Sequence, residues 1–160
     1  MKYGPLSATA DGLAVASVDD LHVRFTPSGV SHHRGSTPLA ETIPWSDVTG
    51  IELTVPTSFV PYPGAFAVAG HALLTLLSQQ VDDVRTEECT IAVTLVHGER
   101  REVPVTPAIG GYWKRAVTNA EVVLCQLIDR PDQRMLLAHP EQIVQRYARA
   151  TRWRLRLASD

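Results

Sequence analysis

The sequence predicts an α+β domain in which β-hairpins are followed by a long amphipathic helix. Residues 21–34 and 89–105 each read as a β-hairpin, because apolar or β-branched runs flank a short turn. Residues 113–128 carry apolar side chains at helical spacing. Strand hairpins followed by a long amphipathic helix are typical of the α+β class.

The composition is that of one globular domain. The chain has 160 residues, of which 44% are hydrophobic and 20% charged, and its net charge is −2. A chain of this length can bury roughly 70% of its surface without a metal or a disulfide. So small a net charge gives no general attraction to nucleic acid or to acidic membranes. We therefore expect a folded domain without a nucleic-acid partner.

The two cysteines and the apolar run near the start of the sequence bear on the cellular location of the protein. Cys89 and Cys125 lie inside apolar runs without CxxC spacing, so we expect both thiols to be buried and reduced. The run 13–18 is too short for the core of a signal peptide. The expected location is cytoplasmic.

The N-terminal half should contain an arm, a hairpin and a corner. Residues 1–12 contain Gly4, Pro5 and Gly12, which predicts a loose arm. In the hairpin, the turn Thr26–Gly29 joins the two strands. In the segment 41–53, Ser46 and Asp47 can bond nearby amides and favour a tight corner, after which residues 51–55 form a strand.

The segment 56–88 reads as an insert. Its prolines exclude a helix at the start, whereas residues 65–80 should be helical with a thin polar stripe, before an acidic connection over 82–88. The apolar part, 65–77, is too short for a membrane span. It should be buried, either on its own sheet or between two copies of the chain.

The C-terminal region should contain two helices and a strand. Arg130 and Pro131 end the helix that begins near Trp113. A second helix should start at Pro140 and bury Ile143, Val144 and Tyr147. Residues 152–157 alternate arginine with apolar residues, which predicts a strand whose exposed edge could pair with another chain.

The segments LHVRFTPSGVSHH, IPWSDVTGIEL and TLVHGERREVPV, followed by the long helix, resemble the bacterial pleckstrin-homology-like (PH-like) domains over roughly residues 13–128. The resemblance implies a bent sheet or barrel plugged by a C-terminal helix. It also implies a non-catalytic module for binding or assembly. The insert and the residues beyond Pro131 depart from the family pattern, so no functional residue is carried over.

No motif indicates an enzyme, a cofactor or a metal. His32 and His33 should point to opposite faces of one strand, and His97 sits in a turn, so these histidines are interpreted as surface residues. The acidic segment 82–88 lacks EF-hand spacing. Gly110 and Gly111 alone are a weak indication of an anion site, and the chain contains no GxSxG motif.

The arginine-rich tail is the one candidate binding site. Arginine suits phosphate, and tryptophan suits a headgroup boundary or a base. The alternative is a solvated face neutralised by residues 82–88, Glu99 or Glu102. The candidate residues for an anionic ligand or a partner are Arg146, Arg149, Arg152, Trp153, Arg154 and Arg156.

Together these features predict an arm (1–12), a PH-like domain (13–130) with its insert (56–88), and a C-terminal helix with a basic tail (131–160). The leading hypothesis is a non-catalytic interaction or scaffold module that associates with itself or with a protein partner. The alternative is peripheral binding to anionic membrane lipid through the tail. Neither hypothesis requires a cofactor or a small-molecule substrate.

Overall fold

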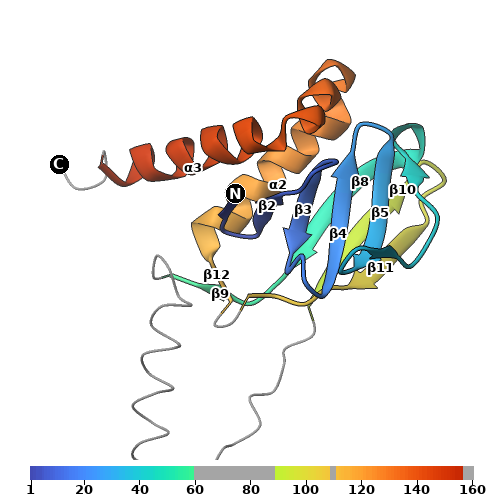
Figure 1. Cartoon of the computed structure of the whole chain (residues 1–160), viewed down its shortest axis with the longest axis horizontal. Helices are drawn as coiled ribbons and strands as arrows, with labels where there is room; N and C mark the ends of the chain where they lie inside the picture. Colours follow the sequence, from blue (N-terminus) through green and yellow to red (C-terminus); the bar gives the residue numbers. More distant parts are fainter. Residues whose placement is uncertain (60–88, 109–110, 157–160) are drawn as a thin grey trace, which may run out of the picture.

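The computed structural model describes residues 1–59, 89–108 and 111–156, with side chains as far as residue 151 (Figure 1). This part of the chain is α+β, with antiparallel sheets and a helical C-terminal region, as predicted. The predicted helix over 65–80 and the acidic connection over 82–88 lie outside the described residues.

The first sheet is built from the N-terminal third of the chain. Its first six strands pair in chain order, and the seventh pairs with β5. They are β1 (Lys2–Tyr3), β2 (Leu6–Ala8), β3 (Leu13–Ala16), β4 (Leu21–Thr26), β5 (Gly29–Arg34), β6 (Thr37–Pro38) and β7 (Ile43–Pro44). The predicted hairpin is confirmed as β4 and β5, with Phe25 opposite Val30 and His22 opposite His33.

A second antiparallel sheet has the order β11-β10-β8, and a short parallel pair joins two further strands. These strands are β8 (Val48–Thr54), β10 (Thr90–Leu95), β11 (Arg100–Pro104), β9 (Thr57–Ser58) and β12 (Tyr112–Trp113). The predicted second hairpin is confirmed as β10 and β11. The corner is also confirmed as a 3-10 turn, η1 (Trp45–Asp47), although the strand after it begins at Val48 rather than at Ile51.

One hydrophobic core joins both sheets to the helices. α2 (Lys114–Asp129) confirms the predicted helix and buries Ala120 and Leu124 completely. Phe25 and Trp45 come from the first sheet and its corner, and Ile91 comes from the second. Because apolar faces of two sheets meet one helix stripe, burial stabilises the three-part arrangement.

The residues 1–12 do not form a loose arm, so that prediction is wrong. β1 and β2 pair with one another, β2 pairs with β3, and Leu6 is fully buried. Gly4 has φ +55°, a conformation that favours glycine in a tight turn, and a Cβ there would lie 2.8 Å from the hydroxyl of Tyr147. Glycine and proline therefore mark a hairpin turn packed on the C-terminal helix.

The tail strand predicted for residues 152–157 is also wrong. After η2 (Pro131–Ala138), α3 runs from Pro140 to Arg156 and lies across one side of the domain, with its C-terminal end projecting past the sheets (Figure 1). It begins at Pro140 and buries Ile143, Val144 and Tyr147, as expected. The helix continues because residues 141–156 contain neither glycine nor proline, and arginine, alanine and leucine favour helix over the local alternation.

Candidate functional site

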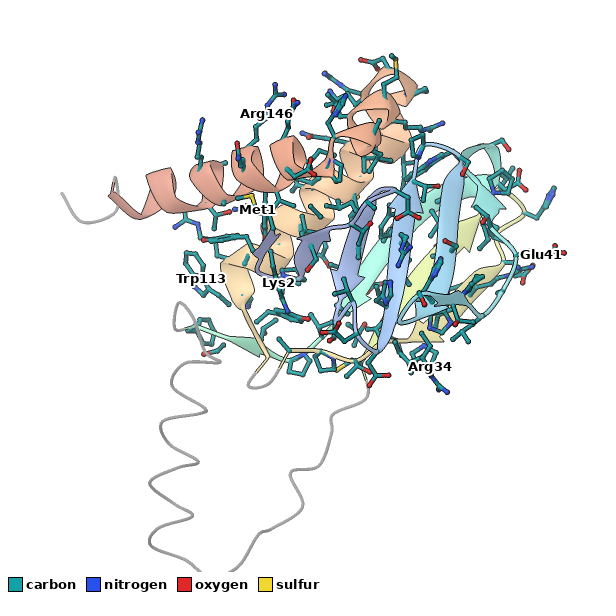
Figure 2. All side chains as sticks on the ribbon, viewed as in Figure 1. Met1, Lys2, Arg34, Glu41, Trp113 and Arg146 are labelled. Atoms are coloured by element: carbon teal, nitrogen blue, oxygen red, sulfur yellow. The ribbon has the colours of Figure 1, made fainter. Side chains whose placement is uncertain are left out.

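The exposed side of α3 is the candidate site that the sequence singled out. Ile143, Val144 and Tyr147 hold the opposite side of the helix against the domain, where α3 contacts α2, β1 and β2. This packing leaves Arg146 and Arg149 exposed. Arg146 points away from the body of the molecule (Figure 2). The buried stripe of the helix therefore sets the direction of these two guanidinium groups.

Glu99 and Glu102, which the sequence offered as neutralising partners for the tail, pair elsewhere. Glu99 accepts a hydrogen bond from Arg101 at 2.7 Å, and Glu102 accepts one from Arg100 at 2.9 Å. Within the described residues, no ion pair involves Arg146 or Arg149. The third neutralising candidate, the acidic segment 82–88, lies outside the described residues.

The remaining candidates lie in the last turns of the same helix. Positions 152, 153, 154 and 156 belong to α3, and their side chains lie outside the described part. A helix brings residues three or four apart to the same side, so positions 149, 152 and 156 share one. A strand would instead have placed 152, 154 and 156 together. The helix therefore places positions 152 and 156 on the same side as position 149, which is a different grouping from the one that the predicted strand implied.

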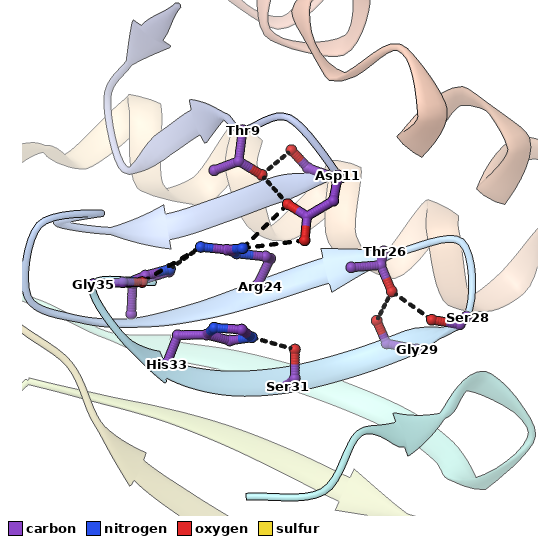
Figure 3. Close-up of polar contacts among 11 residues, drawn as sticks. Thr9, Asp11, Arg24, Thr26, Ser28, Gly29, Ser31, His33 and Gly35 are labelled. Carbon is purple, nitrogen blue, oxygen red and sulfur yellow. Dashed lines mark hydrogen bonds and ion pairs between the residues drawn. The ribbon is translucent and has the colours of Figure 1, made fainter. Parts of the chain in front are cut away.

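A second polar cluster, which was not predicted from the sequence, lies on β4, β5 and the loop before β3 (Figure 3). Arg24 donates from Nη1 to the carboxylate of Asp11 at 3.1 Å and from Nη2 to Nε2 of His22 at 3.2 Å. The rings of His22 and His33 stack with centroids 5.5 Å apart. His33 also hydrogen-bonds Ser31 at 2.9 Å.

The hydrogen bonds of His22 fix its protonation state. Arginine can only donate, so Nε2 of His22 must accept and carries no proton. Its Nδ1 then carries the proton and donates to the carbonyl oxygen of Asp20 at 3.0 Å. His22 is fully buried, and desolvation followed by the charge of Arg24 lowers its pKa. His22 is therefore a neutral imidazole.

His33 and Asp11 complete the electrostatics of the cluster. Desolvation, then Arg24 and His22, lowers the pKa of His33. Partial burial raises the pKa of Asp11, but the hydrogen bonds from Arg24 and Thr9 outweigh it, so its pKa is below the usual value. The cluster contains one ion pair and two neutral rings. The ion pair between Asp11 and Arg24 joins the loop before β3 to strand β4.

The histidines and cysteines lie only partly where the sequence predicted. His32 and His33 do point to opposite faces: His32 bonds the carbonyl of Pro104, whereas His33 is buried, so interpreting it as a surface residue was wrong. Cys89 is buried as expected, but Cys125 is exposed, because it lies on the solvent side of α2. Gly110 lies outside the described residues.

The described part of the chain shows neither a metal-binding group nor a membrane-spanning helix. It contains no group of three or more histidine, cysteine or carboxylate side chains that could hold a metal ion. None of its helices is long and apolar enough to cross a membrane.

A sequence signal for the histidine cluster does exist. Residues 22 and 24 alternate with apolar neighbours, which places them on one face of β4. His33 joins them only through the register of the hairpin, which follows from the turn at 26–29. Asp11 arrives from a loop, and nothing in the pattern points to it.

Comparison with known proteins found no family model, no curated protein and no solved structure that matches this chain.

Proposed function

We propose that this protein is a non-catalytic interaction module with a PH-like fold that binds anionic membrane lipid through the exposed side of α3. Two antiparallel sheets share a core that a helix covers, an arrangement that fits the expected family architecture. Since no relative suggests a function, the site itself is the basis for the proposal.

One observation carries the proposal. Arg146 and Arg149 are exposed, have no acidic partner among the described residues and lie away from the packed side of α3. By contrast, Arg24, Arg100 and Arg101 each pair with a carboxylate. Basic residues near an anionic bilayer contribute about 1 kcal/mol each, and arginine binds phosphate in a bidentate manner.

Self-association has less support than the sequence suggested. The tail strand that was to pair with a second copy is a helix. The edge strand β11 carries Arg100, Arg101, Glu102 and Pro104, and such charges and prolines protect an edge from pairing. The remaining argument is the apolar segment 65–77, which lies outside the described residues. We therefore treat a dimer as an outcome to be measured.

Vesicle co-sedimentation tests the proposal. The full chain is mixed with phosphatidylcholine vesicles, with or without phosphatidylserine, at low and high salt. We expect binding only to the anionic vesicles and only at low salt, because the contact is electrostatic. Arg146→Ala/Arg149→Ala should weaken partitioning by roughly 25-fold, because about 1 kcal/mol per charge corresponds to about fivefold for each arginine.

Two controls separate charge from other effects. Arg34→Ala removes an exposed charge at the opposite end of the molecule and should leave binding unchanged (Figure 2). Arg146→Lys/Arg149→Lys keeps both charges and should retain most of the binding. If the wild-type chain ignores anionic vesicles, or if the double alanine variant binds as the wild type does, the proposal is wrong. Analytical ultracentrifugation of the same samples measures self-association.

A further inference from the structure

A patch of aromatic and basic side chains lies where β9 and β12 meet the start of α2. We call Phe59, Trp113, Lys114 and Arg115 the aromatic–basic patch. β9 and β12 run parallel, with Ser58 opposite Trp113. Phe59 and Lys114 are the residues that follow these two, so the pairing brings them side by side.

Each cation of the patch lies over an aromatic ring. Nζ of Lys114 is 5.3 Å from the centre of the Phe59 ring, and the guanidinium of Arg115 is 5.8 Å from the centre of the Trp113 ring. No ion pair in the described residues involves Lys114 or Arg115. The patch therefore presents aromatic surface together with positive charge that no acidic side chain of the described residues pairs with.

The exposure of Phe59 needs an explanation. Its side chain is 84% exposed, the highest value among the large apolar residues of the described part. Leaving such a ring in water forgoes a favourable burial, and an exposed cation–π contact recovers only part of it. Aromatic rings beside lysine and arginine are the combination that favours the interface between headgroups and acyl chains.

The patch and the basic side of α3 lie at the same end of the molecule. In Figure 2, Trp113 lies below the C-terminal half of α3, on the side of the helix opposite Arg146, whereas Arg34 and Glu41 lie at the other end of the molecule. Membrane attachment that relies on charge alone is weak, and a second, apolar signal strengthens it. Charge complementarity thus points to an anionic bilayer as the occupant of the patch.

We infer that the aromatic–basic patch is a second contact with the anionic bilayer, in which Phe59 and Trp113 enter the headgroup region while Lys114 and Arg115 contact phosphates. This inference rests on the proposed function, since it names a further part of the same membrane-facing end. The arginines of α3 would attract the protein to the anionic bilayer, and the aromatic rings of the patch would insert into its headgroup region.

Variants of the patch test the inference with the same phosphatidylcholine–phosphatidylserine vesicles. Phe59→Ala should lower the partition coefficient about tenfold, and this factor should stay the same at each salt concentration at which the wild-type chain binds, because the lost contact is apolar. Phe59→Leu should retain most of the binding. Lys114→Ala/Arg115→Ala should weaken binding by about fivefold per charge, and only at low salt. Met135→Ala is the matched control, since Met135 is also exposed, at 77%, but lies on η2.

Fluorescence reports insertion directly. Trp153→Phe leaves Trp45, which is buried, and Trp113, which is half-buried. Bromine-labelled lipids should quench Trp113 in this variant on anionic vesicles, and Trp113→Phe should abolish the quenching.

The outcomes distinguish the two proposals. If Phe59→Ala and Lys114→Ala/Arg115→Ala bind as the wild type does and no quenching occurs, while Arg146→Ala/Arg149→Ala loses binding, the patch is not a contact and the proposed function stands. If the wild-type chain does not bind, both proposals fail. Circular dichroism and thermal melting of each variant confirm that a loss of binding is not a loss of fold.

Discussion

The guanidinium of Arg24 donates to Nε2 of His22 at 3.2 Å, inside a sheet face where His22 is fully buried. This contact requires a neutral imidazole, because protonation of Nε2 would replace a hydrogen bond with two cations at the same distance. His33 stacks on His22 and is buried in turn. The first sheet therefore contains two buried histidines that are uncharged in the folded protein.

Stability should fall on mild acidification. Both histidines have a folded pKa lowered from 6.5, so the unfolded chain takes up protons first as the pH drops. Their contribution is complete above about pH 6.5 and is lost progressively below it. Urea unfolding at a series of pH values should show the free energy of unfolding decreasing from neutral pH toward pH 5. His33→Gln should flatten this dependence, and His97→Gln, in an exposed turn, should not. A pH-independent wild type would contradict the neutral state of the two imidazole rings.

The Asp11–Arg24 ion pair titrates in a different window. The pKa of Asp11 is lowered from 3.8, so its contribution is present above that value and is lost as the pH falls through the folded pKa. Below about pH 4, the wild type should lose the contribution of this ion pair to the free energy of unfolding. Asp11→Asn should not show this pH-dependent loss. The change at neutral pH should be under about 1 kcal/mol, because the carboxylate is exposed. Unfolding curves of the variant and the wild type, measured across both windows, separate it from the histidines.

The junction between α2 and α3 depends on one hydroxyl. Tyr147 donates to the carbonyl oxygen of Ala116 at 2.5 Å in a buried setting, and desolvation raises the pKa of Tyr147 so that the hydroxyl stays protonated. Tyr147→Phe should cost about 1–3 kcal/mol of the free energy of unfolding. Met135→Ala, on the surface, should cost almost nothing. Equal stabilities would mean that the bond contributes little to holding α3 in place.

The loop before β3 approaches the backbone of β4 too closely for a side chain at Gly12. A Cβ there would lie 2.1 Å from the carbonyl oxygen of Phe25, so the backbone itself must move. Gly12→Ala should destabilise the domain by more than about 1 kcal/mol. At Gly50 the nearest atom to a Cβ would be at 3.4 Å, and Gly50→Ala should be nearly neutral. Thermal melts of the two variants compare them directly.

The two thiols should differ in accessibility. Cys125 is exposed on α2, and Cys89 is buried. Local desolvation, then Asp129 and Glu121, raises the pKa of Cys125, so its thiolate is scarce at neutral pH. Mass spectrometry after treatment of the folded protein with iodoacetamide should show slow labelling at Cys125 and none at Cys89. Labelling of both residues at equal rates would contradict the burial of Cys89.

Much of the fold could be predicted because local patterns and tertiary structure agree there. The hairpin at Leu21–Arg34, the corner at Trp45 and the helix after Trp113 each have a period or a turn that burial reinforces. The strand prediction for residues 152–157 was wrong because the alternating pattern covers only six residues. A helix that begins at Pro140, and that Tyr147 anchors to α2, continues through them to Arg156. At residues 1–12, the same glycine and proline are compatible with a loose arm or with a tight hairpin. The burial of Leu6 distinguishes the two, and that burial is seen only in the structure.

The candidate site was partly predictable for a similar reason. Composition alone located the arginines, but only the helix shows that Arg146 and Arg149 face away from the domain while Glu99 and Glu102 are paired elsewhere. The aromatic–basic patch joins Phe59 to Lys114 across a parallel strand pair that no local pattern announces. Contacts between distant segments depend on register, and the sequence leaves that register open.

The central claim is that the exposed side of α3 binds an anionic bilayer. Its most direct test is the salt dependence of partitioning onto phosphatidylserine-containing vesicles, measured for the wild type and for Arg146→Ala/Arg149→Ala. We expect strong binding at low salt for the wild type, and weaker binding with a shallower salt dependence for the variant. Identical curves for the two proteins, or no binding by either, would contradict it.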